Sequence, residues 1–174
     1  MSFPARDRAM ETATGPMLLA VEAVPEAQAV VAEAARLARR SHADVLVLSV
    51  REREYVRGFA WDIHQPGEIA ATISDALYEL QRVGVPARGF IRNARSGRVA
   101  NEIVYAAHRY HVSQIVIGAS RRSWLGRLFF GSVAPRVLRL SDLPVLIVRG
   151  PDRNDSRGPA PSGSPRGARG HARA

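Results

Sequence analysis

The chain has 174 residues, of which 46% are hydrophobic, and this is enough for one globular domain with its own core. It has no cysteine, which excludes disulfides and thiol chemistry, and no apolar run near the roughly 18 residues that a transmembrane helix needs. Residues 1–15 lack the apolar segment of a secretory signal, so we expect a cytoplasmic protein. All 25 basic residues are arginine and the formal net charge is +9, which favours anionic partners such as nucleotides, nucleic acid or acidic lipid.

Strand-like apolar runs alternate with amphipathic helical patterns between two polar ends. Residues 1–15 are expected to be disordered, and residues 150–174, rich in Gly, Pro, Ser and Arg, are expected to form a disordered basic tail. The predicted strands are 17–22, 43–50, 87–93, 113–119 and 143–149. The predicted helices are 25–40, 66–84, 96–111 and 132–141, and residues 51–65 are expected to form a connection.

This alternation predicts an α/β fold with a single doubly wound sheet of five parallel strands and helices on both faces. Several predicted strands are continuous Val, Ile and Leu runs, which is typical of strands buried on both faces. Ligands of such sheets bind beyond the carboxyl ends of the strands, at the point where the strand order reverses. Candidate site residues are therefore expected directly after the strands.

The segment most informative about function runs from Gly118 to Ser132 and reads GASRRSWLGRLFFGS. It connects the predicted strand QIVIG to a predicted helix, and the free N–H groups at a helix start favour phosphate. Four arginines lie in the segment or just after it: Arg121, Arg122, Arg127 and Arg136. Because guanidinium groups match phosphate oxygens in charge and shape, the segment predicts a phosphate cradle.

The same segment resembles the nucleotide motif of the universal stress protein family, Gly-x2-Gly-x9-Gly-Ser/Thr. Gly118, Gly131 and Ser132 match the motif in type and spacing, whereas Arg121 stands at its second glycine. The resemblance extends from about residue 17 to residue 149 and includes the closing SVAPRVLRLSDLPVLIVR, so residues 16–149 are interpreted as one such domain. It implies the strand order 3-2-1-4-5, in which the first and fourth strands end side by side.

The resemblance also implies which residues would bind ATP, alone or with Mg²⁺. Gly131 and Ser132 would contact the triphosphate, and Val133, which follows them, belongs to the same binding segment. Glu22 stands where ATP-binding relatives usually have an aspartate near the ribose or the metal. Val50, at the predicted end of the second strand, stands where the backbone of such relatives meets adenine.

Each of these residues also has an interpretation without a ligand. Arg121 either pairs with the phosphates or fills the space that they need. The absence of a side chain at Gly118 either admits a phosphate or ribose or serves a turn. Ser132 is equally suited to cap the helix that follows it, and Glu22 is alternatively an exposed acid after a strand.

We expect neither a metal centre nor a catalytic set of residues. His108 and His111 are three apart in a predicted helix, but no third ligand accompanies them. Ser96 and Gly97 are expected to open that helix, where they could also approach phosphate or ribose. The sequence has no Gly-x-Ser-x-Gly elbow, and without lysine it has no Walker motif. The protein is therefore not expected to be an enzyme, beyond slow ATP hydrolysis at most.

The resemblance implies an ATP-binding stress-response regulator, in which the nucleotide orders residues 118–132 and changes a dimer contact or a surface for an unknown protein partner. One alternative is a scaffold or interaction protein of the same fold that binds no ATP. Another is electrostatic binding of nucleic acid by residues 150–174. A homodimer is expected through the last strand, from Leu143 to Arg149, because it is apolar and lies at the sheet edge in the implied order.

Overall fold

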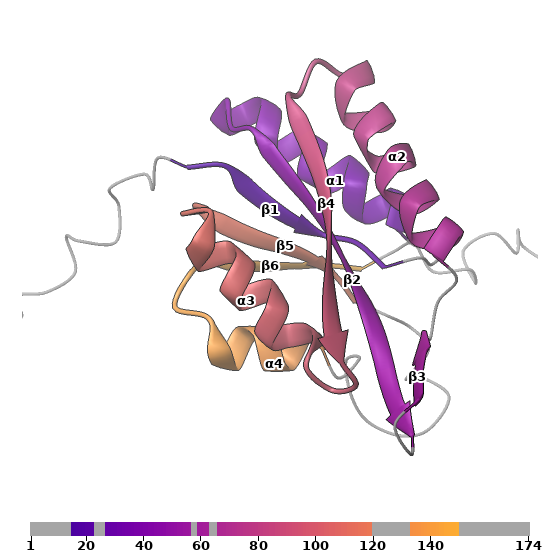
Figure 1. Cartoon of the computed structure of the whole chain (residues 1–174). Helices are drawn as coiled ribbons and strands as arrows, with labels where there is room; N and C mark the ends of the chain where they lie inside the picture. Colours follow the sequence, from indigo (N-terminus) through magenta and orange to yellow (C-terminus); the bar gives the residue numbers. More distant parts are fainter. Residues whose placement is uncertain (1–14, 23–26, 57–58, 63–65, 120–132, 150–174) are drawn as a thin grey trace, which may run out of the picture.

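A computed structural model of the chain describes residues 15–22, 27–56, 59–62, 66–119 and 133–149 (Figure 1). The expected disordered ends therefore lie outside the described residues, except for Gly15. The strands are β1 (Met17–Ala20), β2 (Val45–Val56), β3 (Phe59–Asp62), β4 (Ala87–Arg95), β5 (Gln114–Gly118) and β6 (Val145–Val148). The helices are α1 (Ala27–Ser41), α2 (Pro66–Arg82), α3 (Val99–Arg109) and α4 (Val133–Leu140).

Five of the strands form a parallel sheet in the order β4-β2-β1-β5-β6. Because β4 is the third of these five along the chain, this is the expected order 3-2-1-4-5, and the predicted fold class is confirmed. Helices α1 and α2 cover one face of the sheet, and α3 and α4 cover the other (Figure 1).

The core consists of two apolar layers, one on each side of the sheet. Successive side chains of a strand point to opposite faces, so each central strand contributes to both layers. The layer against α1 and α2 includes Met17, Leu19, Val45, Val47 and Val116. The layer against α3 and α4 includes Leu18, Leu46, Leu48, Ile115 and Ile117. Burial on both faces explains why these strands are continuous apolar runs in the sequence.

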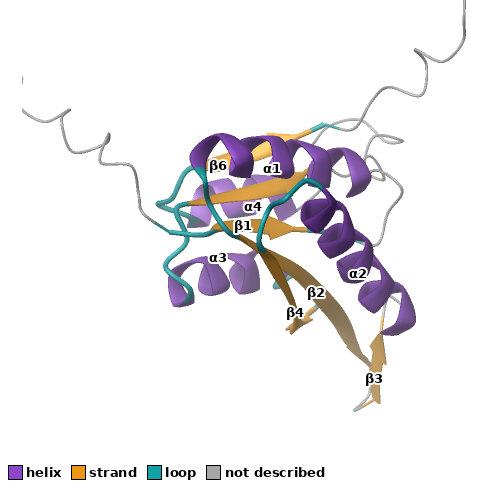
Figure 2. Ribbon diagram, turned by 90° about the horizontal axis from the view of Figure 1, so that it is seen from above, coloured by secondary structure: helices purple, strands orange, loops and turns teal. Residues whose placement is uncertain are grey.

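The second strand is longer than expected, and the expected connection at residues 51–65 contains a further strand. β2 does not end at Val50 but continues to Val56, and its last four residues pair antiparallel with β3. Together β2 and β4 form an arm with β3 at its far end (Figure 2). Polar residues follow Val50 in β2, and here backbone pairing with β4 and β3 extends the strand without an apolar pattern.

The helix boundaries follow the sequence signals with one correction. Helix α2 ends at Arg82, and Gly84 adopts a left-handed conformation with φ 76°, as expected for a glycine that ends a helix. Helix α3 begins at Val99 rather than at Ser96. Ser96 and Gly97 form a turn before it, and Gly97 has φ 74°, a conformation in which a side chain would be strained.

Candidate functional site

The reversal of strand order between the carboxyl ends of β1 and β5, which we call the switch point, is the candidate site that the topology defines. The two strands pair up to Ala20 and Ile117. Beyond that pair, the N–H of Val21 donates to Leu48 of β2, whereas the N–H of Ala119 donates to Val148 of β6. The backbones thus remain bonded to their outer neighbours, and the helices that follow them along the chain, α1 and α4, lie on opposite faces. This is the reversal of strand order at which ligands of such sheets bind.

Two of the predicted site residues lie at the strand ends of the switch point, and a third opens the helix that follows β5 along the chain. Glu22 follows β1 by two residues, is exposed and has no hydrogen-bond or ion-pair partner among the described residues. Gly118 is the last residue of β5. Val133 is the first residue of α4 and packs against the core layer of α3 and α4. Arg121, Gly131 and Ser132 lie outside the described residues.

Gly118 has a packing role that the sequence alone did not indicate. A Cβ atom built on it would lie 2.9 Å from Cγ2 of Val30 in α1, closer than side chains normally approach. Helix α1 thus sits against β5 at a position where only glycine fits without a shift. The glycine of the motif is explained by helix–strand packing as well as by access for a ligand.

Val50 does not have the position that the sequence predicted for it. It pairs with Arg92 inside the β2–β4 ladder, and β2 continues for six residues beyond it. Its half-buried side chain packs against the layer of α3 and α4. The strand end expected at Val50 is therefore wrong, because β4 is long enough to pair with β2 as far as Arg53.

A hydrogen-bonded cluster links the β4–α3 turn to β2 and α4. The N–H of Gly97 donates to Oε1 of Glu52 at 2.7 Å, and Nη1 of Arg136 donates to the carbonyl of Gly97 at 2.6 Å. One of the four arginines assigned to the phosphate cradle thus binds the protein's own backbone. The role of Glu52 was not predicted from the sequence. Gly97, in its left-handed conformation, binds both charged partners and so holds the cluster together.

The described residues contain no group of three or more His, Cys, Asp or Glu side chains that could hold a metal ion. His108 Nε2 lies 3.3 Å from Asp142 Oδ1, whereas His111 lies in the turn after α3 with φ 50°.

On α1, a hydrogen bond from Arg36 holds the pKa of the Glu33 carboxyl below its ordinary value. None of the helices in the described part of the chain combines the length and apolar character needed to cross a membrane.

Comparison with known proteins agrees with this architecture. A profile of the universal stress protein family matches residues 14–149. A universal stress protein of Methanocaldococcus jannaschii is 40% identical over 57 residues, which are 33% of this chain and 34% of that protein. The aligned part therefore spans about a third of that curated relative.

Solved structures share the fold. A universal stress protein of Archaeoglobus fulgidus superposes with a TM-score of 0.64 at 27% identity, covering 76% of this chain and 97% of its own. A structure from the same organism in complex with dAMP has a TM-score of 0.58 at 23% identity, with 78% and 98% covered. A universal stress protein in complex with cAMP has a TM-score of 0.57 at 21% identity, with 79% and 98% covered. With a family match over most of its length and the same strand order, this chain belongs to the universal stress protein family.

Proposed function

We propose that the protein is a nucleotide-responsive regulator that binds an adenine nucleotide, ATP alone or with Mg²⁺, at the switch point between β1 and β5. The observation that carries this proposal is the reversal of strand order where the pairing of β1 with β5 ends at Ala20 and Ile117, with Gly118 at the end of β5 and Val133 at the start of α4. The complexes of similar proteins with dAMP and cAMP support the adenine nucleotide as the ligand class. Gly131 and Ser132 supply free N–H groups toward the phosphates, and Glu22 supplies a carboxylate toward the ribose.

The nucleotide acts on the equilibrium between conformations rather than as a substrate. A ligand shifts such an equilibrium only by its difference in affinity for the two states. In the state that the nucleotide favours, residues 118–132 are ordered around the phosphates. The surface that this state offers to a protein partner in the cytoplasm differs from that of the other state. Arg121 either contributes a charge to the phosphates or restricts them, and hydrolysis is slow at most.

Calorimetric titration of the full chain with ATP, with and without Mg²⁺, tests the proposal. We expect measurable heat and a rise in the melting temperature that grows with ATP concentration, because a ligand of the folded state stabilises it by mass action. Glu22→Gln keeps the size of the side chain and removes its charge, so it should weaken binding without changing the stability of the unliganded protein. Absence of both heat and thermal shift at millimolar ATP would contradict the proposal.

A scaffold that binds no nucleotide is the second candidate function. The contact between the Gly118 position and Val30 favours it, because packing alone is sufficient to require glycine there. The same experiment separates the two candidates, since the scaffold requires an intact fold and no response to ATP.

We also propose a homodimer through β6. Among the described residues β6 pairs with β5 alone, and its four residues are half-buried. The carbonyls of Pro144 and Val148 accept hydrogen bonds from the N–H groups of Ile115 in β5 and of Ala119 just after it. Ile147, one residue before Val148, therefore directs its N–H to the free edge. An apolar edge of this kind favours pairing with a second copy about a two-fold axis.

Ile147→Pro removes that outward N–H and leaves the pairing with β5 in place. We expect light scattering to give the mass of two chains for the native protein and of one chain for Ile147→Pro. An equal mass for both proteins would contradict a contact through this edge.

A further inference from the structure

A stripe of arginine and aromatic side chains runs along the β4 edge of the sheet, where β4 meets α3. Its members, which we call the β4–α3 stripe, are Arg88, Phe90, Arg92, Tyr105, Arg109 and Tyr110. Arg88, Phe90 and Arg92 alternate along β4 and therefore point to one face of it. That face is the one covered by α3, because Phe90 packs against the layer that α3 helps to form.

Five of the six side chains make ring contacts within the stripe, in one group of three and one pair. The rings of Phe90 and Tyr110 have centroids 5.0 Å apart at 58°. The guanidinium of Arg92 lies 4.6 Å from the ring centroid of Tyr105, and that of Arg109 lies 5.9 Å from the ring centroid of Tyr110. Tyr105 and Tyr110 remain 53% and 39% exposed, so both rings still offer area to a ligand.

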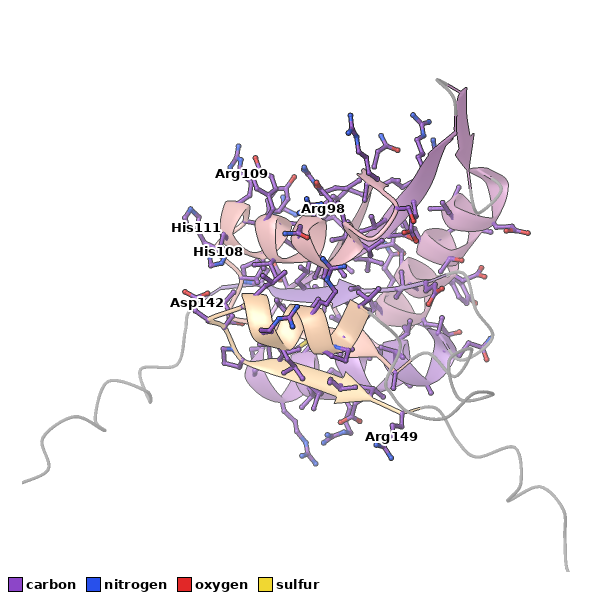
Figure 3. All side chains as sticks on the ribbon, turned by 90° about the horizontal axis from the view of Figure 1, so that it is seen from below. Arg98, His108, Arg109, His111, Asp142 and Arg149 are labelled. Carbon is purple, nitrogen blue, oxygen red and sulfur yellow. The ribbon has the colours of Figure 1, made fainter. Side chains whose placement is uncertain are left out.

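The charge of the stripe is positive. Its nearby carboxylate, Glu102, accepts a hydrogen bond from Nε of Arg92 at 2.7 Å. Neither Arg88 nor Arg109 forms an ion pair with a carboxylate in the described part of the chain. Arg98 precedes α3, so arginines stand at both ends of this helix (Figure 3). Arg88 and Arg92 alone are about 13 Å apart along the strand, which suits an extended polyanion better than a single phosphate group.

Arginines on an edge strand also have a protective role, because charge discourages pairing with other chains. That role does not require two exposed tyrosines beside them. Arginine beside an exposed aromatic ring is the pairing that binds single-stranded nucleic acid, in which the cations contact phosphates and the rings stack on bases. The bases of a duplex stack on one another and leave no faces accessible, so Tyr105 and Tyr110 could not stack on them.

We propose that the β4–α3 stripe binds single-stranded nucleic acid, with Tyr105 and Tyr110 stacking on bases and Arg88 and Arg109 contacting phosphates. This surface belongs to the folded domain and is separate from residues 150–174, for which only electrostatic binding was expected. It also shares no residue with the candidate site at the switch point between β1 and β5, so the two ligands do not compete for residues.

The stacking part is tested by fluorescence anisotropy of the full chain with a labelled oligodeoxythymidine. Tyr105→Ala should weaken binding by about fivefold or more, the range of one stacking contact, and Tyr105→Phe should restore it. Tyr78→Ala is the matched control, because Tyr78 is 65% exposed on α2, on the other face of the sheet. Inorganic polyphosphate, which has charge but no bases, should bind Tyr105→Ala and the native protein equally. Equal oligonucleotide affinities of the Tyr105→Ala and Tyr78→Ala variants would overturn the proposal.

The phosphate part is tested by the salt dependence of the same binding. Arg88→Ala should lower the slope of log affinity against log salt by about 0.7, the value for one phosphate contact with a single strand. Arg39→Ala removes an exposed arginine from the last turn of α1 and should leave the slope unchanged. Equal slopes for both variants, or tighter binding of duplex than of single strand, would overturn the proposal.

Discussion

The central strands β1 and β5 and the arm formed by β2 and β4 are parts of one sheet with different sources of stability. β1 is buried along all four residues, and the middle three residues of β5 are buried as well. The arm extends beyond this centre, and its outer part contains the consecutive charged residues Arg51, Glu52 and Arg53 of β2, which still pair with β4. The centre, together with residues 45–48 of β2, therefore depends on apolar burial, whereas the outer part of the arm depends on backbone pairing and on local polar contacts.

The largest expected effect on stability comes from truncating a buried side chain in the central strands. Leu18 in β1 is fully buried in the layer of α3 and α4, so Leu18→Ala should lower the free energy of unfolding by about 2–5 kcal/mol. Ile91→Ala in β4 is the matched aliphatic truncation in the arm, where the side chain is 38% exposed, and should cost about 1 kcal/mol or less. Denaturant unfolding of the two variants measures the difference. Similar losses would mean that the arm is as dependent on burial as the centre.

An intermediate effect is expected at the end of β5, where the centre meets the switch point. Gly118→Ala places a methyl group 2.9 Å from Val30 Cγ2 and should lower the free energy of unfolding by about 1–3 kcal/mol. Val30→Ala removes the clashing atoms, so the double variant should be more stable than the sum of the single losses predicts. Strict additivity would contradict the packing explanation of this glycine. Loss of ATP binding in a double variant of restored stability would assign Gly118 a second role, toward the ligand.

The difference between centre and arm also explains what the sequence could predict. The runs MLLA and QIVIG are largely apolar because both faces of these strands are covered. Burial on both faces therefore produces a pattern that can be recognised in the sequence. The parallel order followed from the alternation of strands with helices and from the family resemblance. β3 and the outer half of β2 were missed because their pairing is a tertiary interaction, which the polar sequence after Val50 does not encode as a pattern.

The positions of the candidate site residues along the fold could be expected from the same pattern, whereas their role in binding stays a prediction. Gly118 ends β5, Glu22 follows β1 by two residues and Val133 opens α4, close to the strand ends and the helix start that the sequence predicted. The roles of Glu52 and Arg136 were not predictable, since they meet at Gly97 across 45 and 39 residues of chain. No local spacing indicates such a contact, although a glycine between a strand and a helix suggests a turn.

The smallest expected effect tests that contact in the arm. Glu52→Ala removes the acceptor of the Gly97 N–H and should lower the free energy of unfolding by about 0.5–1.5 kcal/mol, the usual net value of one hydrogen bond. Glu52→Gln keeps an acceptor oxygen and should lose less. Because Arg136 still holds the carbonyl of Gly97, the turn should remain formed, and the change should appear as faster hydrogen exchange of the Gly97 amide. Unchanged exchange at Gly97 would show that Glu52 does not protect this amide in solution, and that pairing of β2 with β4 alone holds the outer arm.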